Sequence, residues 1–322
     1  MIKILYAASN SVGAKIRLHR FLQAIKGKNY HLKIAAYIKS SPAVSIDWTL
    51  DALYRLNVNS FNFDNDNFRV FYNQVKSFNP DLVISDIEVF SSYIADLLNI
   101  KCWQVSPLFL HDSASEYVKY KVKLEIKYPH LYHHLYNEIL EALIGHADKK
   151  LVYSYFGDVN QWELSKGYEW VRPYYIEGKD SKIAKHDIVS ISPNANSKLV
   201  EFSQRYKDSV FFLDKHTKLD KLLNKSLYDQ NEYASNLRNA KYFFNEGYGN
   251  FMADAFYNKQ YAFTIPNYND PECVMEALYS KHFKYGNLMF LSESVFNKYK
   301  FDFKLNDNVK FLHEKIDEEF EC

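Results

Sequence analysis

The sequence contains little cysteine, almost no net charge and no long apolar run. Its three cysteines are odd in number and share no metal-type spacing, which argues against a disulfide framework and a zinc site. The net charge of +1 argues against a chain-wide field that would attract nucleic acid. No stretch approaches the roughly 18 apolar residues of a membrane span, and the N-terminus lacks the apolar core of a signal peptide. We therefore expect a cytoplasmic protein.

Glycine is also scarce, at nine residues in 322, while 47% of the residues are hydrophobic and 25% are charged. This composition predicts a soluble globular protein with a large core and argues against disorder. A chain of this length favours two domains over one.

The first half of the sequence alternates strand-like and helix-like segments. Apolar runs predict strands at 2–8, 31–38, 81–86, 101–107 and 149–156, and helix-period patterns predict helices at 16–26, 67–79 and 91–99. A polar loop is expected at 9–15. Because parallel neighbours cannot be joined by a tight turn, this alternation predicts a doubly wound parallel sheet.

Residues 114–147 interrupt the alternation with a stretch rich in Tyr, Lys and His. We interpret this stretch as a helical insert that covers the sheet. The alternative is a helix pair that binds an acceptor molecule or makes a peripheral membrane contact through 116–137. The polar segment 168–187 is interpreted as a linker because it contains Pro173 and Gly178.

The pattern then restarts, with strands expected at 187–192, 209–214, 241–245 and 261–266, and helices at 196–206, 219–228, 249–259 and 270–283. A helix or loop is expected at 231–240. The sequence therefore predicts two Rossmann-like α/β domains, at 1–175 and 176–322. The tail from about 287 is expected to be helical in part and to cross back to the first domain.

Two of the nine glycines, Gly247 and Gly249, fall within three residues, between a predicted strand and a predicted helix. The carboxyl ends of strands in doubly wound sheets bind ligands, because free N–H groups and the positive end of a helix dipole meet there. Glycine removes the Cβ atom where a phosphate approaches the backbone. Asp254 follows in the first turns of the helix, where a carboxylate can bind a ribose diol.

A second strand end follows at Pro266, and Asp270 and Glu272 come just before or in the first turn of the next helix. Carboxylates at that place can accept hydrogen bonds from sugar hydroxyls. The competing interpretation is ordinary capping, because glycine at such turns and acids at helix N-termini are common without any ligand. The combination of both features in one stretch favours a binding site.

These residues carry a family resemblance. The stretch 237–282, "LRNAKYFFNEGYGNFMADAFYNKQYAFTIPNYNDPECVMEALYSKH", resembles the donor-binding segment of GT-B glycosyltransferases, in the group of the UDP-glycosyltransferases and the lipid-II-forming N-acetylglucosaminyltransferase. Residues 4–25 resemble the first strand, glycine loop and first helix of that family, and residues 78–107 resemble its middle N-domain unit.

The resemblance implies a role for several residues. The diphosphate would lie on Gly247, Tyr248, Gly249 and Asn250, Asp254 would bind the ribose, and Asp270 with Glu272 would bind the sugar. Ser192 and Asn194 follow another strand of the second domain and can donate to phosphate or sugar. In the first domain the phosphate and acceptor cleft would be formed by Ser11, Gly13, Lys15, Arg17 and His111.

The sequence departs from the family at two positions. Ala14 stands where the family often has the histidine that serves as general base, and Cys273 stands where it has a glutamine that binds the sugar. An inverting transfer needs a base to take the acceptor proton. We therefore expect Asp86 or Glu88, at the end of the strand 81–86 and just after it, to be the catalytic base, with His19 as an alternative; capping of the following helix is the competing role. His111 and Asp112, at another strand end, are expected to line the acceptor cleft. A retaining transfer needs no strong base.

Taken together, the sequence predicts a GT-B glycosyltransferase whose two domains face a cleft, with the acceptor on the first and the nucleotide sugar on the second. A UDP-sugar is the favoured donor, and neither a metal nor another cofactor is expected. Asp64 and Asp66 resemble a metal-binding pair, but we interpret them as a turn. The alternatives are a GT-B-shaped binding or partner protein without catalysis, which Ala14 motivates, and a nucleotide-sugar epimerase.

Overall fold

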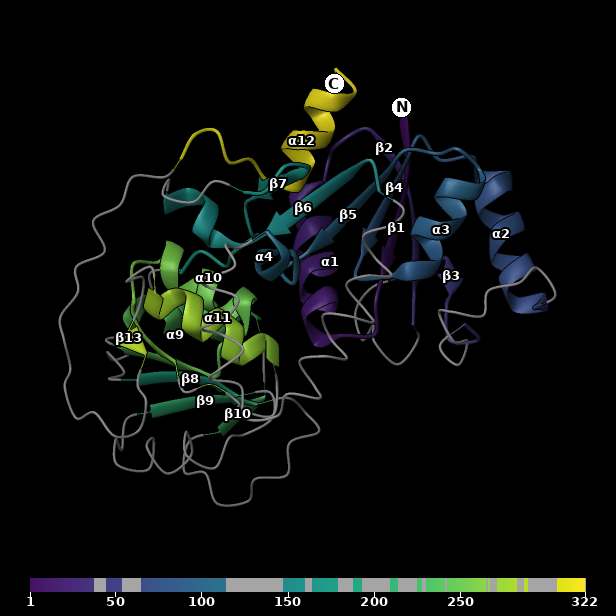
Figure 1. Ribbon diagram of the computed structural model, residues 1–322. Coiled ribbons are helices and arrows are strands. Elements are labelled where there is room, and N and C mark those ends of the chain that lie inside the picture. Colours follow the sequence, from purple (N-terminus) through teal and green to yellow (C-terminus); the bar gives the residue numbers. More distant parts are fainter. Residues whose placement is uncertain are drawn as a thin grey trace. The chain divides into compact units, whose positions relative to one another are not determined.

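The computed structural model describes residues 1–37, 45–53, 65–113, 147–159, 164–178, 188–192, 209–213, 225–227, 230–240, 242–264, 266, 271–282, 287–288 and 306–321. The chain divides into two compact units (Figure 1). Unit 1 comprises Met1–Ala114, His133–Tyr174 and Leu305–Cys322, and unit 2 comprises Ser115–Tyr132 and Tyr175–Lys304. The expected insert lies outside the described residues, apart from its last residue.

The described strands of unit 1 form a seven-stranded parallel sheet in the order β3-β2-β1-β4-β5-β6-β7. They are β1 (Ile2–Ala8), β2 (Tyr30–Ala36), β3 (Trp48–Thr49), β4 (Leu82–Asp86), β5 (Cys102–Ser106), β6 (Lys149–Tyr153) and β7 (Tyr168–Val171). Every residue of β4 and β5 is buried. Central parallel strands are covered on both faces, which is why these two read as nearly continuous apolar runs.

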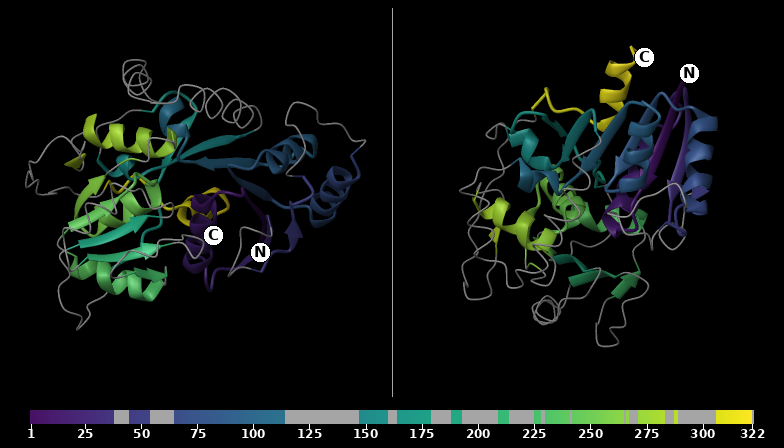
Figure 2. Two further views of the ribbon diagram at one scale, coloured as in Figure 1. Left: turned by 90° about the horizontal axis from the view of Figure 1, so that it is seen from below. Right: turned by 45° about the vertical axis from the view of Figure 1, so that its right-hand side comes forward.

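Helices cover both faces of this sheet. Phe21 of α1 (Val12–Ala24) and Ile316 of α12 (Leu312–Glu319) pack in one apolar cluster with Trp103. Phe71 of α2 (Asp66–Phe78) and Ile94 of α3 (Val89–Leu97) pack in a second cluster on the opposite face. Figure 2 shows α12, in yellow, beside α1, in purple. The short helices α4 (Phe109–Asp112) and η4 (Tyr155–Val159) follow β5 and β6.

The C-terminal helix is fixed to unit 1 by charged contacts as well as by its apolar face. Lys28 and Lys149 form ion pairs with Asp317 and Glu319 at 2.6 and 2.7 Å. The preceding segment pairs with the end of β7, where the Arg172 amide donates to the Lys310 carbonyl at 2.8 Å. The last residues of the chain are therefore part of the first sheet's structure.

The described strands of unit 2 form a second parallel sheet in the order β10-β9-β8-β11-β12-β13. They are β8 (Ile188–Ser192), β9 (Ser209–Leu213), β10 (Lys225–Leu227), β11 (Tyr242–Asn245), β12 (Tyr261–Thr264) and β13 (Asn287–Leu288). The described helices of this unit are α9 (Gln230–Asn239), α10 (Gly249–Tyr257) and α11 (Pro271–His282). The predicted α/β class with two Rossmann-like sheets is confirmed.

Three expectations about single elements were wrong. The loop expected at 9–15 is mostly helix, because the Ser11 hydroxyl accepts a hydrogen bond from the Ala14 amide at 3.1 Å and begins α1 at Val12. The expected linker starts with a strand, β7, whose aromatic and β-branched residues suit a sheet. The helix expected at 219–228 contains β10, since pairing with β9 overrides its helical pattern. None of the described helices combines the length and apolarity needed to cross a bilayer.

Candidate functional site

Asp86 ends β4 at the carboxyl edge of the unit 1 sheet, and its side chain is 0% exposed. Arg17 of α1 donates from Nη2 to Oδ1 at 2.6 Å and from Nε to both oxygens at 3.1 and 3.0 Å. The Tyr6 hydroxyl donates to Oδ2 at 2.8 Å. Burial, and then the charge of Asp86, raise the pKa of the Tyr6 hydroxyl. Asp86 is thus saturated by protein donors, and it joins β4 to α1 and β1.

Arg17 was expected to contact phosphate, but the structure places its guanidinium inside the sheet edge. The side chain is buried, and its charge lies 5.5 Å from the ring centroid of Tyr153 in addition to the pair with Asp86. A buried, hydrogen-bonded ion pair is costly to break. The contacts therefore support a structural role for both members of the pair. The catalytic role of Asp86 and the phosphate contact of Arg17 stay predictions.

Glu88, the second candidate base, is the N-cap of α3. Its carboxylate accepts from the amides of Phe90 and Ser91 at 3.0 and 2.7 Å. Burial raises the pKa of this carboxyl, while the Ser91 and Phe90 hydrogen bonds oppose the shift. Ile87, between the two acids, has a φ of 53°, in the left-handed region that β-branched residues rarely adopt. The contacts of Asp86 and Glu88 hold this turn against its local preference.

The other first-domain candidates lie around α1 and α4. Ser11 is the exposed N-cap of α1, and Gly13 and Lys15 are half-buried within the helix itself. Ala14 is fully buried in the apolar cluster, so the position of the family histidine is a core position here. His111 is buried in α4. Its neighbour Asp112 accepts a hydrogen bond from the Tyr168 hydroxyl.

In unit 2 the glycine turn connects β11 to α10. The side-chain oxygen of Asn245 accepts from the Gly247 amide at 2.8 Å, which closes the turn. Gly247 has a φ of 96°, and a Cβ atom there would lie 2.4 Å from the carbonyl oxygen of Cys273 on α11. A Cβ atom at Gly249 would lie 3.0 Å from Oε1 of Glu276. Gly247 is therefore required by its φ and by the close approach of the α11 backbone, whereas at Gly249 the nearest atom is the end of the flexible Glu276 side chain.

The open side of the turn is formed by Tyr248 and Gly249, which are half-exposed, while Asn250 is buried in the first turn of α10. The amides of Phe251 and Met252 donate to the Tyr248 carbonyl at 3.0 Å, and the N-terminus of the helix carries the positive end of its dipole. The sequence prediction placed the strand end, the glycines and the helix start correctly in one place. The binding of a diphosphate there stays a prediction.

Asp254, the expected ribose ligand, is 0% exposed in α10. Oδ1 accepts from the Ile176 amide at 2.7 Å, and Oδ2 accepts from the Tyr233 hydroxyl at 3.0 Å. Asn258, one turn later, donates to the Ile176 carbonyl at 2.7 Å. Asp254 therefore anchors the segment that enters unit 2, and a ribose would have to replace one of its protein donors.

Of the remaining candidates, Glu272 is half-exposed in the first turn of α11. Ser192 is the last residue of β8, and the structure describes its backbone only. Asp270 and Asn194 lie outside the described residues. Searched over the described residues, no cluster of three His, Cys, Asp or Glu side chains could hold a metal ion.

Sequence reasoning missed two buried acids beside the glycine turn. Glu246 lies in the turn itself with 0% exposure, and Glu276 lies on α11 with 1% exposure. Both carry a signal in the sequence: Glu276 interrupts the apolar run 273–279, and Glu246 follows the apolar strand β11 directly. Acids are rarely buried without a partner, so an acid at a position that the apolar pattern assigns to the core is a signal of a special role.

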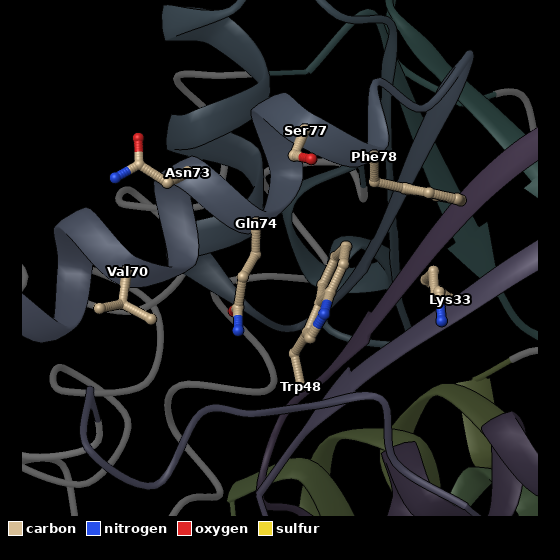
Figure 3. Close-up of a pocket in the computed structure, with 7 residues that line it drawn as sticks. All are labelled: Lys33, Trp48, Val70, Asn73, Gln74, Ser77 and Phe78. Carbon is tan, nitrogen blue, oxygen red and sulfur yellow. The ribbon is translucent and has the colours of Figure 1, made fainter.

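A groove of about 570 Å³ lies elsewhere, at the edge of unit 1 beside α2. Figure 3 shows Trp48 between Gln74 and Lys33, with Asn73 and Val70 along the helix. None of the predicted site residues lines this groove, so it does not enter the candidate site.

The comparisons with known proteins agree with this architecture. The family model described as "Glycosyl transferase family 1" matches residues 49–299. The chain belongs to this family. The matched residues run from β3 of unit 1 to beyond β13 of unit 2, and they include the glycine turn and α11.

Three solved structures show the same fold at low sequence identity. The spinosyn forosaminyltransferase SpnP is 13% identical with a TM-score of 0.55, and the match covers 92% of this chain and 87% of SpnP. The calicheamicin glycosyltransferase CalG4 is 12% identical with a TM-score of 0.60, covering 90% and 85%. The Streptomyces sp. SF2575 glycosyltransferase SsfS6, complexed with thymidine diphosphate, is 12% identical with a TM-score of 0.57, covering 89% and 88%. The predicted GT-B fold is confirmed. Among curated proteins, none matches the sequence.

Proposed function

We propose that this glycosyltransferase moves a sugar from a nucleoside-diphosphate sugar to an acceptor hydroxyl, with the donor diphosphate bound at the turn between β11 and α10. The observation that carries the proposal is the half-exposed Tyr248–Gly249 edge at the start of α10. Helix N-termini at strand ends bind phosphates through free amides and the helix dipole. The thymidine diphosphate bound to SsfS6 supports this donor class. UDP and TDP are therefore the nucleotides to test first.

In the reaction the acceptor oxygen forms a bond to the anomeric carbon, the bond from that carbon to the diphosphate breaks, and the acceptor proton passes to a base. Charge develops on the departing diphosphate, and the amides of the first turn of α10 can stabilise it. This stabilisation takes the place that a metal ion has in other phosphate chemistry. We therefore propose that transfer is independent of divalent metal ions.

A second candidate function is a GT-B-shaped protein that binds a nucleotide sugar without transferring it. Three observations favour it: Ala14 is a core residue, Asp86 is paired with Arg17, and Glu88 caps α3. Asp86 and Glu88, the two residues first expected to supply a base, thus both have structural contacts.

Two measurements test the proposal. Calorimetric titration with UDP, TDP and GDP measures nucleotide binding, and we expect micromolar affinity for UDP or TDP. Incubation with radiolabelled UDP- and TDP-sugars, with and without EDTA, then measures slow donor hydrolysis. Hydrolysis that EDTA leaves unchanged supports a metal-independent transferase. Binding without hydrolysis supports the second candidate, and no binding to any of the nucleotides contradicts both.

A further inference from the structure

Glu276 is a buried acid that the fold does not explain. Its side chain is 1% exposed, and within the described part of the chain its Oε2 has no hydrogen-bond partner. Burial, and then the charge of Glu272 one helical turn earlier, raise the pKa of this carboxyl well above its ordinary value. A buried polar group without a partner is rare in native proteins, and a bound ion, a water molecule or a role in catalysis or binding is among its explanations.

The position of Glu276 links it to the glycine turn. Its Oε1 lies 3.0 Å from the place that a Cβ atom of Gly249 would take, so the carboxyl reaches the first residue of α10 where a side chain is absent. Gly249 is half-exposed. An anion held by the first amides of α10 would therefore lie next to this carboxyl.

The charge state of such a carboxyl decides whether an anion can approach. A neutral carboxylic acid can donate its O–H to a phosphate oxygen, whereas a carboxylate would repel it. Glu272, one turn earlier on α11, is the acid whose charge acts on Glu276. Glu246 in the turn and Asp254 on α10 are acids of the neighbouring elements, and the Asp254 carboxylate accepts from Ile176 and Tyr233. Like charges favour the protonated form.

We propose that Glu276 binds the donor as a neutral acid, donating a hydrogen bond to a phosphate oxygen of the diphosphate held at Gly249. This inference rests on the proposed function, and it adds to it a hydrogen-bond donor on α11 and a pH dependence. Affinity for the diphosphate is highest while Glu276 is protonated and falls as the pH rises through its elevated pKa.

The experiment is a calorimetric titration of UDP and TDP at about pH 7 and about pH 9.5, on the wild type, Glu276→Gln and Glu276→Leu. The amide of Gln keeps a hydrogen-bond donor but has no ionisable proton. We expect Glu276→Gln to bind UDP and TDP with near wild-type affinity at the lower pH. At the higher pH the affinity of the wild type should decrease, whereas that of Glu276→Gln should not. Glu276→Leu should weaken binding at least tenfold, about 1.4 kcal/mol.

Two controls separate binding from folding. Glu232→Gln removes an exposed acid of α9 and should leave both affinity and pH profile unchanged. Uridine and thymidine, which lack phosphate, should bind all variants alike, and thermal melting checks that Glu276→Leu is folded. If Glu276→Leu binds as tightly as the wild type, or Glu276→Gln keeps the wild-type pH dependence, the inference is overturned while the proposed function stands. If the wild type binds no nucleotide, both are overturned.

Discussion

The turn after β4 in unit 1 and the turn after β11 in unit 2 occupy the same place in two Rossmann-like sheets, but one acid beside the second turn differs in its contacts from the acids of the first. Asp86 accepts from Arg17 and Tyr6, and Glu88 accepts from two helix amides. Glu276, beside the second turn, has an oxygen without a partner among the described residues. Saturated acids hold a fold together, whereas an unsatisfied one is suited to a ligand.

The largest expected effect on stability comes from breaking the buried ion pair between Asp86 and Arg17. Asp86→Asn leaves the buried Arg17 charge uncompensated, so we expect a loss of about 3–5 kcal/mol in the free energy of unfolding, measured by urea denaturation. Asp66→Asn, at an exposed ion pair, is the control and should change stability by less than about 1 kcal/mol. A stable Asp86→Asn protein that binds nucleotide but has lost turnover would restore Asp86 as the catalytic base.

The next effect tests why the unit 2 turn contains glycine. Gly247 and Gly27 have similar φ values of 96° and 90°, but only Gly247 has backbone atoms within 4 Å of its missing Cβ. Gly27→Ala should cost about 1–2 kcal/mol from backbone strain alone. Gly247→Ala should cost roughly 1–3 kcal/mol more, because α11 must move. Equal losses, measured by thermal and urea denaturation, would show that α11 does not press on the turn.

Substitution of Asp254 tests whether an acid in unit 2 also stabilises the fold. Asp254→Ala leaves the buried Ile176 amide and Tyr233 hydroxyl without their acceptor, and we expect a loss of about 2–3 kcal/mol in unfolding free energy. Tyr233→Phe removes one of these hydrogen bonds and should cost about 1 kcal/mol. Nucleotide titration of both variants decides the ribose role. A loss of UDP affinity in Asp254→Ala that Tyr233→Phe does not share would assign Asp254 to the ribose.

The smallest expected effect is an increase in stability, whereas the preceding substitutions at Asp86, Gly247 and Asp254 lower it. Glu276→Gln should raise the free energy of unfolding by about 1 kcal/mol near neutral pH, because the wild-type acid is neutral when folded and ionised when unfolded. A raised folded-state pKa means that the native state binds more protons, so wild-type stability falls as the pH rises from the unfolded pKa towards the folded one. The Glu276→Gln variant should lack this part of the decrease in stability with rising pH. A lower stability of Glu276→Gln would mean that the ionised carboxylate has a partner.

The strands were predictable because burial on both faces leaves a continuous apolar run. The strand expected at 2–8 is β1 to the residue, and that at 81–86 differs from β4 by one residue. The weak strands β3, β10 and β13 carry no such run, since they have two or three residues and depend on a neighbour for pairing. Local pattern cannot supply that neighbour.

The candidate site was predictable in its place but not in its contacts. Strand ends and glycines identified the turn at 245–249, because backbone chemistry is local. Arg17 is 69 residues from Asp86 in the chain, and Ile176 is 78 residues from Asp254. Their spacing contains no information on that pairing, so the sequence could not show that these acids are buried against protein donors; their catalytic and ribose roles stay predictions. Only packing shows which acids are already occupied.

The measurement that tests the account most directly is hydrogen–deuterium exchange with and without UDP, followed in peptides that cover the β11–α10 turn and the β4–α3 turn. We predict that UDP slows exchange of the amides at 247–251 and leaves those at 87–91 unchanged. Protection at the β4–α3 turn with none at the β11–α10 turn would contradict the assignment of the donor site to unit 2.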